Sequence, residues 1–182
     1  MIVSWQRGKA DANRVAEEIR SAGGLCEILA YDARKPADAQ LASLAEAPTH
    51  AYYFATPSIF RGRDEVFSSE RLEEFLKVYV DGFWELAREL RARRSDVSIF
   101  YPSSIAVAER PRGMTEYSMA KAAGEVLCAD INETLAPMRV TVKRLPRLAT
   151  DQTTSIVPVD TASAPETMLP IIREVQAGGR SR

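Results

Sequence analysis

The chain alternates short apolar runs, typical of buried strands, with longer runs whose apolar residues recur at helical spacing. The apolar runs predict strands over residues 1–5, 25–32, 49–57, 96–104 and 139–146. The helical spacing predicts helices over residues 11–24, 36–47, 68–94, 115–136 and 165–179. Two polar stretches, residues 58–67 and 147–164, are expected to be loops.

The order of these elements predicts an α/β fold. Alternating strands and helices favour a parallel sheet with helices on both faces. The strands are apolar rather than cleanly alternating, as expected when both faces are buried. We therefore expect a three-layer, doubly wound, Rossmann-like sheet in a single domain spanning residues 1–182. In such sheets ligands bind beyond the carboxyl ends of the strands.

Composition and charge narrow the classes of function. The 182 residues are 46% apolar and 27% charged, with a net charge of −1, so the basic excess of a nucleic-acid binder is absent. No apolar run approaches the roughly 18 residues of a membrane span, and no signal peptide is recognised, so we expect a cytoplasmic protein. The two cysteines lie far apart and the single histidine, His50, has no ligand motif, so no metal site is expected.

Candidate chemistry lies in "MTEYSMAKAAGE", residues 114–125. Tyr117 precedes Lys121 by four residues, so the two side chains share one face of a helix. Ser104 ends the strand before them. A phenol, an ammonium that lowers its pKa, and a hydroxyl would together suit proton transfer to a carbonyl oxygen. The alternative is a chance Tyr-x-x-x-Lys match and a serine that only caps a turn.

The stretches "SSIAV" and "EYSMAKAAGE" resemble the catalytic serine and the Tyr-x-x-x-Lys signature of short-chain dehydrogenases/reductases. This resemblance implies that Ser104, Tyr117 and Lys121 are catalytic, and that Tyr117 and Lys121 also contact the cofactor. "RVTVKRLPRLAT" resembles the segment leading to the family's nicotinamide-binding turn, which implies a cofactor contact at Pro146, although Arg147 follows it in place of glycine.

The resemblance also implies an adenosine end of the cofactor site. "LAYDARKPAD" resembles the family's third strand, whose terminal aspartate, here Asp32, contacts the adenine. "FATPS" occupies the position of an Asn-Asn-Ala-Gly turn, which places Ala55 at the cofactor. Arg7 follows the first strand, where an arginine favours the 2′-phosphate of NADP over NAD. Lys9 would add a second positive charge beside Arg7. The alternative is that Arg7 and Lys9 are a solvated basic pair that binds no cofactor.

The sequence also departs from the family pattern. None of its glycines forms the family's opening Gly-rich turn, and the chain begins at what resembles the second strand. We therefore expect an N-terminally truncated fold, without a central strand, that leaves two strand edges exposed. Tyr79 stands where the family carries an asparagine that holds a relay water, and it is expected to fill that space.

These features imply an NAD(P)-dependent oxidoreductase that reduces a carbonyl or oxidises an alcohol, with NADP preferred and the substrate unidentified. The alternative is a catalytically incomplete domain that serves as a binding or structural module, with no cofactor bound by this chain. The resemblance further implies a homodimer or homotetramer formed by the long helices. Their expected apolar surface consists of Phe83, Trp84, Leu127 and Ile131.

Overall fold

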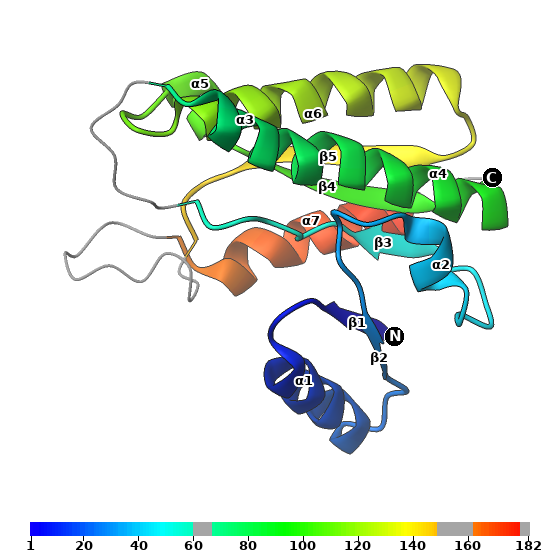
Figure 1. Ribbon diagram of the computed structural model, residues 1–182. Coiled ribbons are helices and arrows are strands. Elements are labelled where there is room, and N and C mark those ends of the chain that lie inside the picture. Colours follow the sequence, from blue (N-terminus) through cyan, green and yellow to red (C-terminus); the bar gives the residue numbers. More distant parts are fainter. Residues whose placement is uncertain (60–66, 149–161, 179–182) are drawn as a thin grey trace.

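Parallel strands form two sheets in the computed structural model, which describes residues 1–59, 67–148 and 162–178 (Figure 1). The strands are β1 (Ile2–Trp5), β2 (Glu27–Ala30), β3 (His50–Tyr52), β4 (Ser98–Ser104) and β5 (Arg139–Leu145). The first sheet pairs β1 with β2, and the second has the order β3-β4-β5. In the second sheet, Ser98 lies opposite His50 on one side and Arg139 on the other.

Helices lie on both faces of the β3-β4-β5 sheet. The helices of the described residues are α1 (Lys9–Ser21), α2 (Ala37–Leu41), α3 (Ser69–Leu76), α4 (Phe83–Arg93), α5 (Ala106–Glu109), α6 (Thr115–Thr134) and α7 (Ala164–Gly178). A π-helical turn, η1 (Lys77–Gly82), joins α3 to α4. Helices α3, α4 and α6 cover one face and α7 covers the other (Figure 1). The three-layer α/β architecture predicted from the sequence is thus confirmed.

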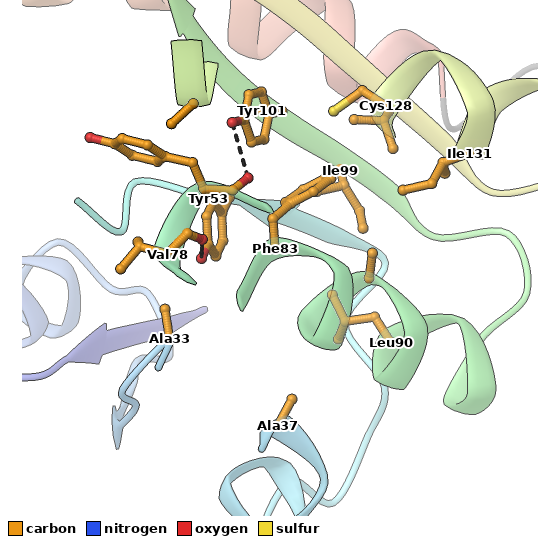
Figure 2. Packing of buried hydrophobic residues seen from close by; sticks show 14 of the residues in the cluster. Ala33, Ala37, Tyr53, Val78, Phe83, Leu90, Ile99, Tyr101, Cys128 and Ile131 are labelled. Atoms are coloured by element: carbon orange, nitrogen blue, oxygen red, sulfur yellow. Dashed lines mark hydrogen bonds between the residues drawn. The ribbon is translucent and has the colours of Figure 1, made fainter. Parts of the chain in front are cut away.

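The core explains why the central residues of β4, 99–102, are all apolar or aromatic. Ile99 and Tyr101 lie in the large cluster beneath α3, α4 and α6, where Figure 2 shows them beside Phe83. Phe100 instead packs with Ile171 on the α7 side. Because successive side chains of a strand point to opposite faces, a strand covered on both faces needs apolar residues at nearly every position.

The predicted helix over residues 68–94 forms, but it is interrupted by η1. A π turn leaves main-chain carbonyls without their usual helical partners, and two tyrosine hydroxyls take that role here. The Tyr53 hydroxyl donates to the carbonyl of Val78 at 2.6 Å, and the Tyr101 hydroxyl donates to that of Tyr79 at 3.1 Å. Gly82 ends the turn, where a Cβ atom would lie 2.1 Å from the Ala33 carbonyl oxygen.

Several predicted boundaries are wrong. The helix expected over residues 36–47 ends at Leu41, and the strand expected over 49–57 pairs only at His50–Tyr52. A strand hydrogen-bonded on one side has fewer ladder bonds to extend it. The short helix α5 was not predicted. Residues 60–66 and 149–161, most of the two predicted loops, lie outside the described residues.

The sheet is interrupted between β1 and β3. Within the described residues, β1 pairs with β2 alone and β3 pairs with β4 alone, so each presents an unpaired edge. Helix α1 packs on β1 and β2, and Figure 1 shows these elements standing apart from the three-layer part. None of the described helices is long and apolar enough to cross a membrane.

Two of the four residues predicted to form an apolar interface are instead part of the core. Phe83 and Ile131 are buried, with exposed fractions of 0% and 2%, so neither contributes surface to a partner. Trp84 and Leu127 are partly buried against the same core. The large exposed apolar side chains of α6 are Met119 and Val126.

Candidate active site

A cavity of about 540 Å³ lies at the carboxyl ends of β3, β4 and β5. Its walls include Ser104 at the end of β4, Tyr117 and Lys121 on α6, Pro146 after β5 and Ala55 after β3. Parallel strands deliver these residues to one edge of the sheet, where ligands of open α/β sheets bind. The structure therefore brings together five of the seven residues that the sequence singled out.

The two serines at the end of β4 have different partners. Ser104 accepts a hydrogen bond from the Ala106 main-chain N–H at 3.2 Å, and its hydroxyl favours a lower pKa for Tyr117. The Ser103 hydroxyl donates to Glu125 at 2.5 Å, and that carboxylate is held by both guanidinium arms of Arg144 at 2.8 and 2.7 Å. Only Ser104 of this pair therefore engages the phenol.

Tyr117 is a buried phenol. Its ring packs edge-on against Phe75 and Tyr79, with 5.8 Å between ring centres in each pair. Burial raises the pKa of Tyr117 above its ordinary value, and the hydrogen bond with Ser104 offsets only part of that rise. The expectation that Lys121 lowers this pKa is therefore wrong: Tyr117 is a neutral proton donor at neutral pH.

Lys121 lies against a different tyrosine. Its ammonium nitrogen is 3.8 Å from the centre of the Tyr79 ring, against 5.9 Å for Tyr117, and it donates to the Pro102 carbonyl at 2.6 Å. Burial lowers the pKa of Lys121 to about 7, against the opposing influence of Cys128 and Glu125. Both the charged and the neutral amine are therefore present at neutral pH.

Tyr79 fills the position where the family resemblance places an asparagine. The residue is fully buried, and its ring stacks on Phe75. Its hydroxyl shares a hydrogen bond of 2.5 Å with Thr56, which follows β3. As expected, the tyrosine side chain fills the space at this position. The contact with Thr56 was not predicted, because no sequence spacing signals a pairing between a π turn and a loop.

A second pocket, of about 470 Å³, contains the remaining predicted cofactor residues. Arg7, which follows β1, and Asp32, which follows β2, line it together with Ala55. The two pockets share Ala55 and Thr56, so they adjoin along the strand ends. Lys9 does not line this pocket; its ammonium lies over the Trp5 ring, 5.7 Å from the centre.

The Asp32 carboxylate is already engaged within the chain. Its Oδ1 atom accepts from the main-chain N–H and the guanidinium of Arg34, at 3.1 and 3.0 Å. Burial favours a higher pKa for Asp32, but these hydrogen bonds outweigh it and hold the pKa below its usual value. The second oxygen lies 3.5 Å from the Gln6 amide nitrogen, so it is the one more open to a ligand.

The donor set fits the two ends of a nicotinamide dinucleotide. Arg7 is exposed and, within the described residues, has no hydrogen bond or ion pair, so its guanidinium is available to a phosphate. Tyr117 and Lys121 lie in the adjoining cavity. Residues 55–58 run between the pocket of Arg7 and the cavity of Tyr117 and Lys121. Among the described residues, no glycine lines either pocket.

Part of the site was not predicted from the sequence. Ile105, Met114 and Leu145 form an apolar wall of the first cavity. Ile105 lies directly before α5, and Met114 lies directly before α6. The Ser118 hydroxyl of α6 donates to the Ala106 carbonyl of α5 at 2.9 Å. Among the described residues, no group of three or more histidine, cysteine or carboxylate side chains could hold a metal ion.

Comparisons with known proteins give matches only among solved structures. No family model matches the chain, and no curated protein matches it. FolM alternative dihydrofolate reductase 1 from Brucella canis, complexed with NADP, superposes with a TM-score of 0.75 at 16% identity, over 100% of this chain and 77% of that one. Alcohol dehydrogenase from Thermococcus sibiricus, complexed with 5-hydroxy-NADP, gives 0.82 at 15% identity, over 100% and 81%.

A gluconate 5-dehydrogenase from Burkholderia cenocepacia, complexed with NADP and tartrate, gives a TM-score of 0.70 at 16% identity, over 83% of this chain and 62% of that one. These structures are short-chain dehydrogenases/reductases. At such identities the likeness establishes the fold. The chain thus has the Rossmann-like fold of the short-chain dehydrogenases/reductases, which confirms at the level of the fold the resemblance found in its sequence.

Proposed function

We propose that residues 1–182 form one Rossmann-like domain that acts as an NAD(P)-dependent oxidoreductase of the short-chain type. It reduces a carbonyl, or oxidises the corresponding alcohol, and prefers NADP. One observation carries the proposal: Ser104, Tyr117 and Lys121 line a cavity that adjoins the pocket of Arg7 and Asp32. The fold shared with an NADP-bound reductase and an NADP-bound dehydrogenase adds support.

The cavity residues have distinct parts in the reaction. Ser104 and Tyr117 both line the cavity, so a substrate carbonyl oxygen between them can accept from both hydroxyls. Burial keeps Tyr117 protonated, which suits a general acid that donates to that oxygen. A bound nicotinamide supplies the hydride. Lys121 is held by the Pro102 carbonyl and carries a charge that depends on pH near neutrality.

The preference for NADP rests on Arg7. Its exposed guanidinium can pair with a 2′-phosphate, which NAD lacks. The Asp32 carboxylate is already paired with Arg34, so it competes only weakly with a 2′-phosphate for the Arg7 guanidinium. We expect Arg7→Ala to weaken NADPH binding about tenfold or more, with little effect on NADH. Arg14→Ala, an exposed arginine on α1 already paired with Asp11, is the matched control.

The test is calorimetric titration of the chain with NADPH and NADH, followed by NADPH oxidation with a panel of aldehydes and ketones. Tyr117→Phe should lower turnover by about 10²-fold or more, whereas Tyr52→Phe, outside both pockets, should leave it unchanged. Absence of NADPH binding by the correctly folded chain would contradict the proposal.

A second candidate function is a binding or structural module without redox turnover. The interrupted sheet favours it, as does Tyr79 in place of a water-holding asparagine. A module of this kind would bind a nucleotide or partner with the same affinity in Tyr117→Phe and wild type, and would oxidise no NADPH with any carbonyl. The titration and turnover measurements therefore separate the two functions.

We further propose that the protein works in the cytoplasm as a homodimer or homotetramer. With Phe83 and Ile131 in the core, the association would rest on Met119 and Val126, which are exposed on α6, and on the partly exposed Trp84 and Leu127. Val126→Glu should then lower the sedimentation coefficient. A wild-type chain that sediments as a monomer at high concentration would rule the assembly out.

A further inference from the structure

Lys121 is set apart from every other lysine of the chain by its surroundings. It is 5% exposed, whereas the remaining four are exposed or half-exposed: Lys9, Lys35, Lys77 and Lys143. It lines the wall of a cavity rather than filling the core. A buried lysine at the edge of an apolar cavity is an arrangement that makes an amine nucleophilic.

The partners of Lys121 are uncharged. Within the described residues its nitrogen donates to the Pro102 carbonyl, and no carboxylate lies within ion-pair distance. The titratable groups around it are Tyr79 on η1, Tyr101 on β4, and Tyr117, Glu125 and Cys128 on α6. Aromatic faces attract the ammonium, but desolvation outweighs them. No ion pair therefore locks the amine in its charged form.

We propose that this cavity is an imine-forming site, in which the Lys121 amine condenses with an aldehyde or ketone without any nicotinamide. The activity goes beyond the proposed reduction and does not depend on it. Tyr117 lines the same cavity with its phenol neutral, so one carbonyl group can lie against both the amine and a proton donor.

The step balances without an oxidant or a reductant. The amine nitrogen attacks the carbonyl carbon, and the oxygen takes the Tyr117 proton. The nitrogen then returns a proton to the phenolate, which gives a carbinolamine. Tyr117 next protonates the hydroxyl, which leaves as water while the nitrogen lone pair forms the C=N bond, and the iminium N–H proton restores the phenol. The net change is amine plus carbonyl to imine plus water.

The wall of the cavity indicates the class of carbonyl compound. Ile105, Met114 and Leu145 face it from three segments, and Phe54, 53% exposed, lies at its rim. Apolar side chains gain most from burying an aliphatic body. The apolar wall therefore suits an aldehyde or ketone with an alkyl chain; Glu109 and Arg147 also line the cavity.

The test uses hexanal and sodium cyanoborohydride, without nicotinamide, followed by peptide mapping of alkylated lysines. We expect Lys121 to be labelled about tenfold faster than the four surface lysines, which are internal controls in the same tube. Its labelling rate should rise between about pH 6 and pH 8 as the amine loses its proton. Glyoxylate, small and charged, should label it more slowly than hexanal.

Two variants distinguish a loss of imine formation at Lys121 from a loss of the native fold. Tyr117→Phe should slow labelling at Lys121 but not at Lys77, whereas Tyr52→Phe should change neither rate. Labelling confined to the surface lysines, with circular dichroism showing the native fold, would overturn the proposal. Because this readout needs no cofactor, its failure is distinct from a failure to bind or oxidise NADPH.

Discussion

At the residue scale, the spacing of Tyr117 and Lys121 placed both on one helix face, but it did not determine which ring the lysine contacts. The ammonium lies 3.8 Å from the centre of the Tyr79 ring and 5.9 Å from that of Tyr117. Tyr79 reaches this place because the π turn and the hydrogen bond with Thr56 hold it there. The pKa of Tyr117 consequently reflects burial and Ser104.

The depressed pKa of Lys121 should make stability depend on pH. Its pKa is about 7 in the folded chain and 10.5 in the unfolded chain, so between these values the unfolded chain binds more protons and stability rises with pH. Below pH 7 the penalty of the buried charge is fully present. Lys121→Met should then be more stable than wild type, on the order of a few kcal/mol.

The measurement is urea denaturation of both chains at several pH values. We expect the difference in the free energy of unfolding to be largest below pH 7 and to narrow toward pH 10. Cys128, whose pKa burial raises to about 12, and Tyr31, also raised to about 12 by burial, act in the opposite sense at higher pH. The Tyr31 contribution is common to both chains and cancels in the difference, whereas the Cys128 contribution does not cancel fully, because Lys121 lowers the Cys128 pKa in the wild type. A gap that stays constant across this range would contradict the assignment.

At the element scale, the sequence predicted the long helix before β4 but not its π turn. Apolar spacing reports which face of a helix is buried, and it cannot report a local widening supported by groups distant in sequence. Here those groups are the hydroxyls of Tyr53 and Tyr101, which bond the carbonyls of Val78 and Tyr79. The turn therefore depends on side chains of β4 and of the residue after β3.

Tyr53→Phe should destabilise the fold by about 1–3 kcal/mol, because it removes the buried hydrogen bond to the Val78 carbonyl. Tyr52→Phe is the matched control. The Tyr52 hydroxyl is buried and has no hydrogen-bond partner in the described part of the chain, so its removal should be neutral or slightly stabilising. Denaturant midpoints report both changes. Equal losses for the two variants would mean that the hydroxyl bond does not support the turn.

At the scale of the whole molecule, the first thirty residues should be the least protected part. Both strands of the β1-β2 sheet leave their residues exposed or only partly buried, and α1 buries mainly Ala12 and Ala16. Elements with few buried apolar contacts open at lower free energy than the core. The β3-β4-β5 part buries large aromatic residues under helices on both faces.

Amide hydrogen exchange should therefore show β1, α1 and β2 exchanging at least about tenfold faster than β4 and α6. The two parts should also differ in denaturant dependence, with the weaker part opening at denaturant concentrations that leave β4 protected. Uniform protection along the chain would instead indicate one cooperative unit that includes the β1-β2 sheet.

The sequence by itself determined the α/β class, nearly all elements, and the helix face shared by Tyr117 and Lys121. These follow from apolar periodicity and from residue types at fixed spacing, which are local properties of the chain. Only the tertiary structure decided that the long helix before β4 widens into a π turn, that Phe83 and Ile131 lie in the core, and that Lys121 lies on Tyr79. Each of these features depends on contacts between segments far apart in sequence and on the burial that those contacts produce. Burial sets the packing and the pKa values, and it leaves no local pattern in the sequence.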